Sequence, residues 1–183
     1  KMIIAGFTSY PWMPDWARFR AIADAVGAYL LADISHIAGM VAAGVVASPI
    51  GHAHVVSFTT HKTLYGPRGA AILTTDKKLA QKIDSAVFPG EQGGPHVNAM
   101  AGMAVTFKLS RSEDFLNLQR QIVANAAHLA SELQKNGLRI PYGGTDTHML
   151  LVDCKGVRAP EGLSPDGKRG TPLMGDYAAR ILD

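Results

Sequence analysis

The chain places an amine and a carboxylate at the ends of two apolar runs. Lys62 closes residues 55–62, where an apolar strand-like segment gives way to hydroxyls, an imidazole and an amine. Asp33 closes a second apolar run, residues 29–32. A lysine amine forms a Schiff base with an aldehyde, and a carboxylate keeps a pyridine nitrogen protonated. The pair therefore fits the requirements of pyridoxal phosphate.

The elements that must position this pair alternate between strand and helix patterns. Apolar residues recur at helical spacing after Asp15 and again in the second half of the chain. Gly, Pro, Lys and Arg accumulate in residues 155–172, which we expect to form an exposed loop. We expect strands at residues 2–7, 29–32, 54–58, 69–74 and 149–152, and helices at 15–27, 36–43, 76–86, 96–109, 113–137 and 176–182.

Alternating elements with continuous apolar strands predict an α/β fold with a largely parallel sheet that is covered on both faces. Ligands of such sheets gather beyond the carboxyl ends of the strands. Asp33 and Lys62 both occupy such ends. This shared position is the main reason, from the residues alone, to regard them as functional.

The longest predicted helix has clear boundary signals. Ser110 and Glu113 have the spacing of a capping box, and Gly137 is a natural stop. We place a domain boundary near the end of this helix, at about 137–140. The apolar stripe expected to face the core consists of Phe115, Leu118, Ile122, Ala126, Leu129 and Leu133.

Ordinary structural roles compete with each functional interpretation. A single lysine is usually a solvated surface charge, and an aspartate that ends a strand is usually a turn or cap residue. His52 and His54 alternate along one strand and could bind a metal, but the sequence offers no third ligand. Residues 92–95 (QGGP) could present backbone amides to a phosphate, although a turn before a proline-started helix is the simpler interpretation.

Composition limits the remaining classes of protein. The 183 residues suffice for one good core and part of a second domain, with 47% hydrophobic and 18% charged residues. No apolar run reaches the roughly 20 residues that cross a bilayer, and the N-terminal segment lacks a signal-peptide cleavage site. The lone Cys154 excludes an internal disulfide, and the scattered charge of +3 gives no case for nucleic acid. We expect no metal site, no membrane association and a cytoplasmic location.

Five ordered motifs carry a resemblance to a known family. They span nearly the whole chain, and only the loop at 155–172 is unlike the usual pattern. The sequence resembles serine hydroxymethyltransferase (glycine hydroxymethyltransferase), a pyridoxal-phosphate enzyme of the aspartate-aminotransferase fold, fold type I. The motifs are residues 32–39 (ADISHIAG), 59–64 (TTHKTL) with 66–69 (GPRG), 86–90 (AVFPG), 92–95 (QGGP) and 143–146 (GGTD).

The resemblance implies a role for each matching residue. Lys62 would hold the coenzyme, Asp33 would pair with its pyridine nitrogen, and His36 would lie beside the ring hydroxyl and the incoming amino acid. Thr8, where the family usually has serine, would keep a hydroxyl near the ring oxygen. Thr59 and His61 would line the pocket beside the Schiff base, and Arg68 would help shape the site. Gly93 and Gly94 would approach the phosphate of the coenzyme in a partner subunit.

The resemblance also implies a reaction, in which the hydroxymethyl carbon of serine passes to tetrahydrofolate and glycine is formed. The site would lie at the interface of a homodimer. Residues 1–138 would belong to the coenzyme-binding large domain, including the long connecting helix. Residues 139–183 would begin a small α+β C-terminal domain.

Departures from the family pattern shape our expectations. The chain starts without a methionine and inside a strand-like run, so we expect an internal section of a longer protein that has little activity alone. The usual phosphate-binding serine-glycine loop, the catalytic glutamate and tyrosines, and a carboxylate-binding arginine are not found. Phe58 and Tyr65 flank the lysine motif where other residues are common, and Thr147 replaces an asparagine near the folate.

Two other classes remain open at this point. A threonine aldolase or an aminotransferase of the same fold would share Asp33 and Lys62 without a response to folate. A non-catalytic scaffold would have no reason to keep Lys62 at the end of a strand.

Overall fold

The computed structural model describes residues 1–158 and 170–182 of the chain, which divide into two compact units. Unit 1 contains Lys1–Thr8 and Met13–Gln121, and unit 2 contains Ser9–Trp12 and Ile122–Asp183. The division falls within the long helix α5, Glu113–Lys135. Our expected domain boundary at 137–140 stays a prediction.

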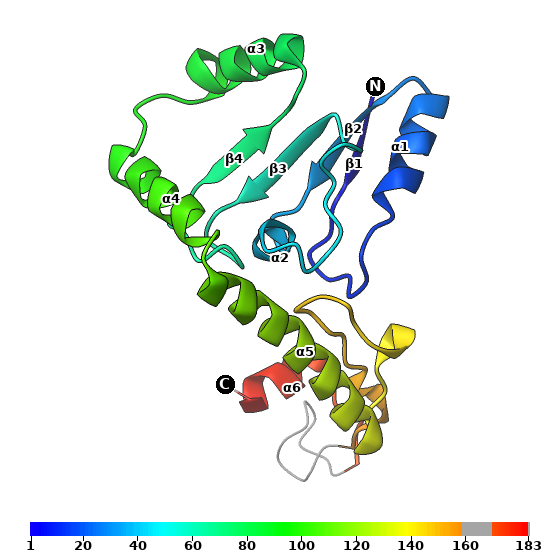
Figure 1. Ribbon diagram of the computed structural model, residues 1–183. Helices are drawn as coiled ribbons and strands as arrows, with labels where there is room; N and C mark the ends of the chain where they lie inside the picture. The colour runs from blue at the N-terminus through cyan, green and yellow to red at the C-terminus, as the bar shows by residue number, and fades with distance from the viewer. Residues whose placement is uncertain (159–169, 183) are drawn as a thin grey trace. The chain divides into compact units, whose positions relative to one another are not determined.

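Unit 1 is built on a four-stranded sheet. Its strands are β1 (Met2–Ala5), β2 (Tyr29–Asp33), β3 (Val55–Thr59) and β4 (Ala70–Leu73), and they lie side by side in this order (Figure 1). β1 pairs with β2 and β2 with β3 in parallel, whereas β3 and β4 are antiparallel. The prediction of a largely parallel α/β sheet is confirmed. The carboxyl ends of the three parallel strands consequently meet at one edge.

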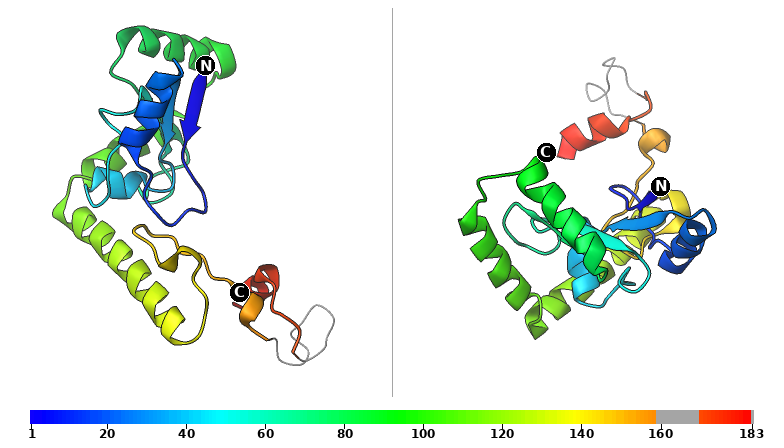
Figure 2. Two further views of the ribbon diagram at one scale, coloured as in Figure 1. Left: turned by 90° about the vertical axis from the view of Figure 1, so that its right-hand side faces the viewer. Right: turned by 90° about the horizontal axis from the view of Figure 1, so that it is seen from above.

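One face of this sheet carries the core of unit 1. Leu30 and Ala32 of β2 are fully buried there, together with Trp16 and Ala23 of α1 (Trp16–Ala25). α1 packs along β1 and β2 (Figure 2). The expected cover on both faces is only partial in the described residues, because on the second face Val55 of β3 is buried whereas Ile4 of β1 is 65% exposed.

Two helices of unit 1 begin at the aspartates that their sequences indicate. The Asp15 carboxylate accepts a hydrogen bond from the Arg18 amide at the start of α1. Asp76 accepts from the amides of Lys78 and Leu79 at the start of α3 (Lys77–Ser85). An N-cap carboxylate satisfies amides that have no partner within the helix, so these starts were predictable.

The long helix α5 differs from its prediction at its start and on its buried face. Ser112, not Ser110, lies just before the helix and its hydroxyl accepts a hydrogen bond from the Phe115 amide, so the expected capping box does not form. Gly137 follows the helix with φ +84°, as expected for a stop. Of the expected stripe, Phe115 and Ala126 are buried, whereas Leu118 and Leu129 are exposed, and Gln119, outside the stripe, is completely buried.

Six further helical elements complete the described residues. The rest of unit 1 contains α2 (Ala38–Ala42), the π-helical segment η1 (Ala86–Glu91) and α4 (Val97–Leu109). Unit 2 contains the 3-10 turns η2 (Pro141–Gly143) and η3 (Cys154–Gly156), and α6 (Gly175–Leu182). The expected helices near 36–43, 96–109 and 176–182 are therefore confirmed.

The strand expected at 149–152 does not form. In its place, the described part of unit 2 has two isolated bridges, Arg139 with Asp153 and Arg158 with Pro172. An apolar run becomes a strand only when a neighbouring strand satisfies its backbone groups, and no such ladder is present in the described part of unit 2. Most of the loop expected at 155–172 lies outside the described residues.

None of the helices described by the structure is both long and apolar enough to cross a membrane.

Candidate active site

A cavity of about 340 Å³ lies where β1, β2 and β3 end. It brings together five of the predicted site residues, and Ile4, Gly6, Phe7 and Ser35 complete its described lining. The predicted residues in the cavity are Thr8, Asp33, His36, Thr59 and Lys62.

Asp33 is held at the end of β2 by the residue two positions later. Ser35 donates two hydrogen bonds to Oδ1 of Asp33, from its amide at 2.9 Å and from its hydroxyl at 2.6 Å. Oδ2 accepts no hydrogen bond from the described residues. Gly6 lies against the Asp33 carbonyl so closely that a Cβ at this position would collide with it. One carboxylate oxygen is therefore occupied and the other is available to a ligand.

Lys62 belongs to the β3–β4 connection, which is closed by a fully buried threonine. The Thr60 hydroxyl donates to the Pro67 carbonyl at 2.6 Å, and the Gly66 amide donates to the Thr60 carbonyl at 2.8 Å. Gly66 approaches Thr60 and Thr106 too closely to accept a side chain. The turn that follows Lys62 is thus tightly constrained on both sides of the lysine.

Thr63 connects this lysine turn to two helices. Its hydroxyl donates to the His36 carbonyl at 3.0 Å and accepts from the Gly39 amide of α2 at 3.0 Å. Its carbonyl accepts a hydrogen bond from Nε2 of Gln119 at 2.9 Å. Sequence reasoning missed Gln119, because a glutamine within an apolar helix face looks like a surface residue. The three contacts fix the backbone around Lys62 relative to that of His36.

His36 has an altered acidity. Burial lowers the pKa of His36 from its ordinary value, the neighbouring positive charge of Lys62 lowers the pKa further, and Asp33 opposes both effects. The neutral imidazole is therefore favoured at physiological pH.

The residues that line the cavity have the chemistry that the ring of pyridoxal phosphate requires. The Thr59 hydroxyl oxygen is buried without a hydrogen-bond partner, and Nζ of Lys62 makes no hydrogen bond or ion pair with the described residues. Buried polar atoms are normally satisfied, so the unpartnered Thr59 hydroxyl favours a ligand in this cavity. A volume of about 340 Å³ is near the lower end of the range for small-molecule sites. In its described lining the amine of Lys62 and the imidazole of His36 are the only basic groups, so a phosphate needs donors from elsewhere.

The other predicted site residues lie away from this cavity. His61 and Arg68 line a second cavity of unit 1, of about 900 Å³, together with Phe88 and Gln92. Nδ1 of His61 is buried without a partner among the described residues. Gly93 and Gly94 follow Gln92 and do not line either cavity in the described lining.

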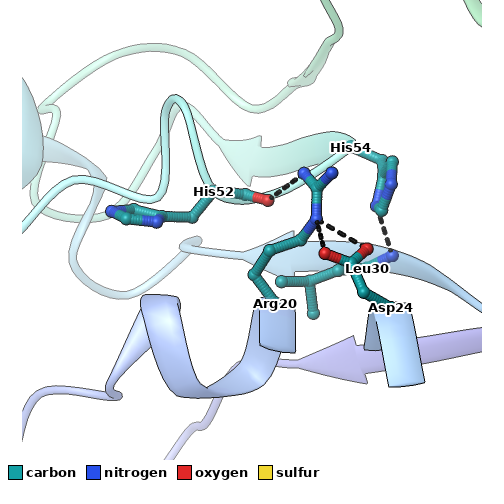
Figure 3. Close-up of polar contacts among 5 residues, drawn as sticks. All are labelled: Arg20, Asp24, Leu30, His52 and His54. Atoms are coloured by element: carbon teal, nitrogen blue, oxygen red, sulfur yellow. Dashed lines mark hydrogen bonds and ion pairs between the residues drawn. The ribbon is translucent and has the colours of Figure 1, made fainter. Parts of the chain in front are cut away.

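The geometry does not favour the alternative of a metal bound by His52 and His54. Nδ1 of His54 accepts a hydrogen bond from the Leu30 amide at 2.8 Å, while His52 precedes β3 and contributes its carbonyl to Arg20 at 2.9 Å. The two imidazoles point away from each other (Figure 3). Among the described residues, no group of three or more His, Cys, Asp or Glu side chains could hold a metal ion.

Thr147, expected near the folate, makes hydrogen bonds within unit 2. It is buried, and its hydroxyl donates to the Pro11 carbonyl at 3.3 Å and accepts from the Met149 amide at 3.2 Å. Thr145 also donates to the Pro11 carbonyl, at 3.0 Å. The hydroxyl of Thr147 therefore stabilises a turn.

Comparisons with known proteins point to one family. A family model described as serine hydroxymethyltransferase matches residues 1–166. A serine hydroxymethyltransferase of Bartonella tribocorum is 56% identical over 155 residues, covering 85% of this chain and 36% of the relative. One of Synechococcus sp. (strain JA-3-3Ab) is 48% identical over 183 residues, covering 100% of the chain and 42% of the relative. A serine hydroxymethyltransferase 2 of Burkholderia pseudomallei (strain 1710b) is 53% identical over 182 residues, covering 94% of the chain and 43% of the relative. The chain thus spans less than half the length of these curated relatives.

Proposed function

The chain belongs to the serine hydroxymethyltransferase family, and from this premise we propose that it forms the lysine-bearing part of an enzyme that interconverts serine and glycine. The hydroxymethyl carbon of serine passes to tetrahydrofolate, and pyridoxal phosphate is the cofactor. The observation that carries the proposal is the cavity shared by Lys62, Asp33, His36, Thr59 and Thr8.

Lys62 and Asp33 have complementary roles in this proposal. When bound, pyridoxal phosphate supplies an electron sink for the negative charge that develops at the α-carbon of the amino acid. The Lys62 amine would hold the coenzyme through its aldehyde. Oδ2 of Asp33 would accept a hydrogen bond from the ring nitrogen and would keep that nitrogen protonated. A carboxylate at this position is therefore chemically required.

The other cavity residues complete the surroundings of the ring. His36, whose pKa is lowered by burial and by Lys62, is a neutral imidazole that can lie beside the ring hydroxyl without introducing a second cation. The unpartnered hydroxyl of Thr59 can donate to the coenzyme or the substrate. Thr8 keeps a second hydroxyl at the ring oxygen.

The complete enzyme, meaning the full-length protein that contains this chain, supplies the rest. We propose a cytoplasmic homodimer of fold type I in which residues 1–138 belong to the large domain and residues 139–183 begin the small domain. His61 and Arg68 shape the site from the second cavity, and Gly93 and Gly94 approach the phosphate of the coenzyme in the partner subunit. The chain alone has little or no activity, because the described lining of the cavity contains no arginine and, besides Lys62 and His36, no basic group to bind a phosphate or a carboxylate.

The direct test of this proposal is covalent capture of the coenzyme. Borohydride reduction of the complete enzyme with pyridoxal phosphate should fix the coenzyme on the Lys62 amine, as detected by mass spectrometry of the Lys62 peptide. The Lys62→Arg variant keeps the charge and should remain unlabelled. Labelling of other lysines alone would refute the assignment.

A folate dependence distinguishes the reaction from those of related enzymes. With serine as the substrate, formation of glycine should require tetrahydrofolate. A threonine aldolase or an aminotransferase would be captured at Lys62 as well, but tetrahydrofolate would not accelerate its reaction.

A further inference from the structure

Ser35 makes more contacts at the candidate site than its place in a turn requires. Its amide donates to Oδ1 of Asp33 at 2.9 Å, which is the usual contact of an aspartate with the residue two positions later. Its hydroxyl makes two further hydrogen bonds. It donates to the same Oδ1 at 2.6 Å and accepts from the Thr59 amide of β3 at 3.1 Å.

These contacts treat the two oxygens of Asp33 unequally. Oδ1 receives two donors, both from Ser35, whereas Oδ2 receives none from the described residues. The Asp33 side chain is solvent-exposed, and an exposed carboxylate is ordinarily free to rotate. With Oδ1 held by two donors, the carboxylate plane is fixed and Oδ2 is the oxygen left for a ligand.

The hydroxyl also connects two strand ends that carry site residues. Asp33 ends β2 and Thr59 ends β3, and both residues line the cavity. Ser35 bridges them because its hydroxyl is a donor to one strand and an acceptor from the other. The orientation of Asp33 is thereby coupled to the backbone that leads to Lys62.

We propose that Ser35 is a positioning residue, which orients Asp33 so that Oδ2 accepts the hydrogen bond of the coenzyme's ring nitrogen. The inference rests on the proposed function, since it concerns the same cavity and the same ligand. Ser35 acts through Asp33 and does not touch the reacting atoms. A serine that merely stabilises the turn would support all ligands of the cavity equally, whereas a positioning residue acts through the ring nitrogen alone.

The test compares two ligands in variants of the complete enzyme freed of coenzyme. One ligand is pyridoxal phosphate, and the other is its deaza analogue, in which a C–H group replaces the ring nitrogen. Dissociation constants are measured by absorbance titration for the unmodified protein, Ser35→Ala, Ser35→Thr and Ser57→Ala. Ser57 is the matched control, because it lies opposite Asp33 in the β2–β3 register, and its hydroxyl makes no hydrogen bond with the described residues.

The Ser35→Ala variant should bind pyridoxal phosphate at least about tenfold more weakly, since a hydrogen bond to a charged group is lost. Its affinity for the deaza analogue should change by no more than about twofold, which is the scatter of independent effects. Ser35→Thr restores the hydroxyl and should restore the affinity, and Ser57→Ala should resemble the unmodified protein. Equal weakening of both ligands, or an unchanged affinity for pyridoxal phosphate, would overturn the proposal.

Amide exchange provides a second measurement in the coenzyme-free protein. The Thr59 amide donates to the Ser35 hydroxyl, so it should exchange faster in Ser35→Ala and at the original rate in Ser35→Thr. An unchanged Thr59 exchange rate in Ser35→Ala would contradict the bridge between the strands. Failure of borohydride to label Lys62 in the unmodified enzyme would instead refute the proposed function, so the two failures are distinguishable.

Discussion

Histidines and pairs of opposite charge occur at both ends of the parallel strands in unit 1. The two ends differ in how many of these polar atoms have hydrogen-bond partners. At the amino ends, Arg20 donates from Nε to both oxygens of Asp24 at 2.9 Å and from Nη1 to the His52 carbonyl (Figure 3). His54 accepts the Leu30 amide through Nδ1, and its carbonyl accepts the Thr74 hydroxyl. Apart from the His52 imidazole, the polar side chains named here bond to one another or to the backbone of this region.

At the carboxyl ends, the same types of residue keep unused capacity. Within the described residues, Lys62 has no partner for its amine, Oδ2 of Asp33 has no donor and the Thr59 hydroxyl oxygen is buried alone. The comparison teaches that charged residues and histidines do not by themselves mark a site. Unused hydrogen-bonding capacity that converges on one cavity does.

The largest expected effect is a difference in turnover between variants of two aspartates, one from each end of the parallel strands. Asp33→Ala in the complete enzyme should lower turnover on the order of 10²-fold or more, because preorganised charge stabilisation at the ring is lost. Asp24→Ala should keep full activity and lower the free energy of unfolding by less than about 1 kcal/mol, because its ion pair with Arg20 is exposed. Steady-state kinetics and urea denaturation measure the two effects. Near-normal turnover of Asp33→Ala would refute the role of the carboxyl end.

At the amino ends of the strands, a smaller effect should appear, and it should change the free energy of unfolding alone. His54→Leu removes the acceptor of the Leu30 amide, which belongs to a fully buried residue, and should lower the free energy of unfolding by about 1–3 kcal/mol. The affinity for pyridoxal phosphate should not change.

The matched control for this prediction is His52→Leu. His52 contacts Arg20 through its backbone carbonyl, so replacement of its imidazole should leave both stability and coenzyme affinity nearly unchanged. Weaker coenzyme binding by His54→Leu would show that the two ends of the sheet are not functionally separate.

Much of this contrast could be predicted from local sequence. The change from apolar residues to Asp33 and to Lys62 is visible within each strand, and parallel strands bring such ends to one edge. Asp15 and Asp76 were predictable caps for the same reason, since a cap bonds to amides within three residues.

The remainder depends on contacts between distant segments. Gln119 is buried because it reaches the Thr63 carbonyl, and no helical periodicity contains that information. The bridge made by Ser35 depends on the β2–β3 register, which brings the Thr59 amide within reach of its hydroxyl. The apolar run at 149–152 did not become a strand because pairing requires a neighbour. Residue type is local information, but its hydrogen-bond partner is not.

The smallest expected effect concerns the acidity of His36. In the coenzyme-free protein, the NMR titration midpoint of His36 should lie below the ordinary value of 6.5, because burial and the Lys62 charge both lower its pKa. Lys62→Met should raise the pKa part of the way, since burial is the larger cause and remains. Asp33→Asn should lower it further, and Asp24→Asn at the other end should not change it.

The sign of the accompanying stability effect follows from proton linkage. Because the folded-state pKa of His36 is lowered, the unfolded chain binds this proton more readily below pH 6.5. The contribution of His36 therefore makes the protein less stable as the pH falls below 6.5 and has no effect well above that value. His36→Gln should remove this part of the acid sensitivity in urea denaturation at pH values on either side of 6.5.

An NMR titration midpoint of His36 that does not respond to Lys62→Met would show that the amine is not close enough to act on the imidazole. The proposal that both side chains face one coenzyme ring would then be wrong.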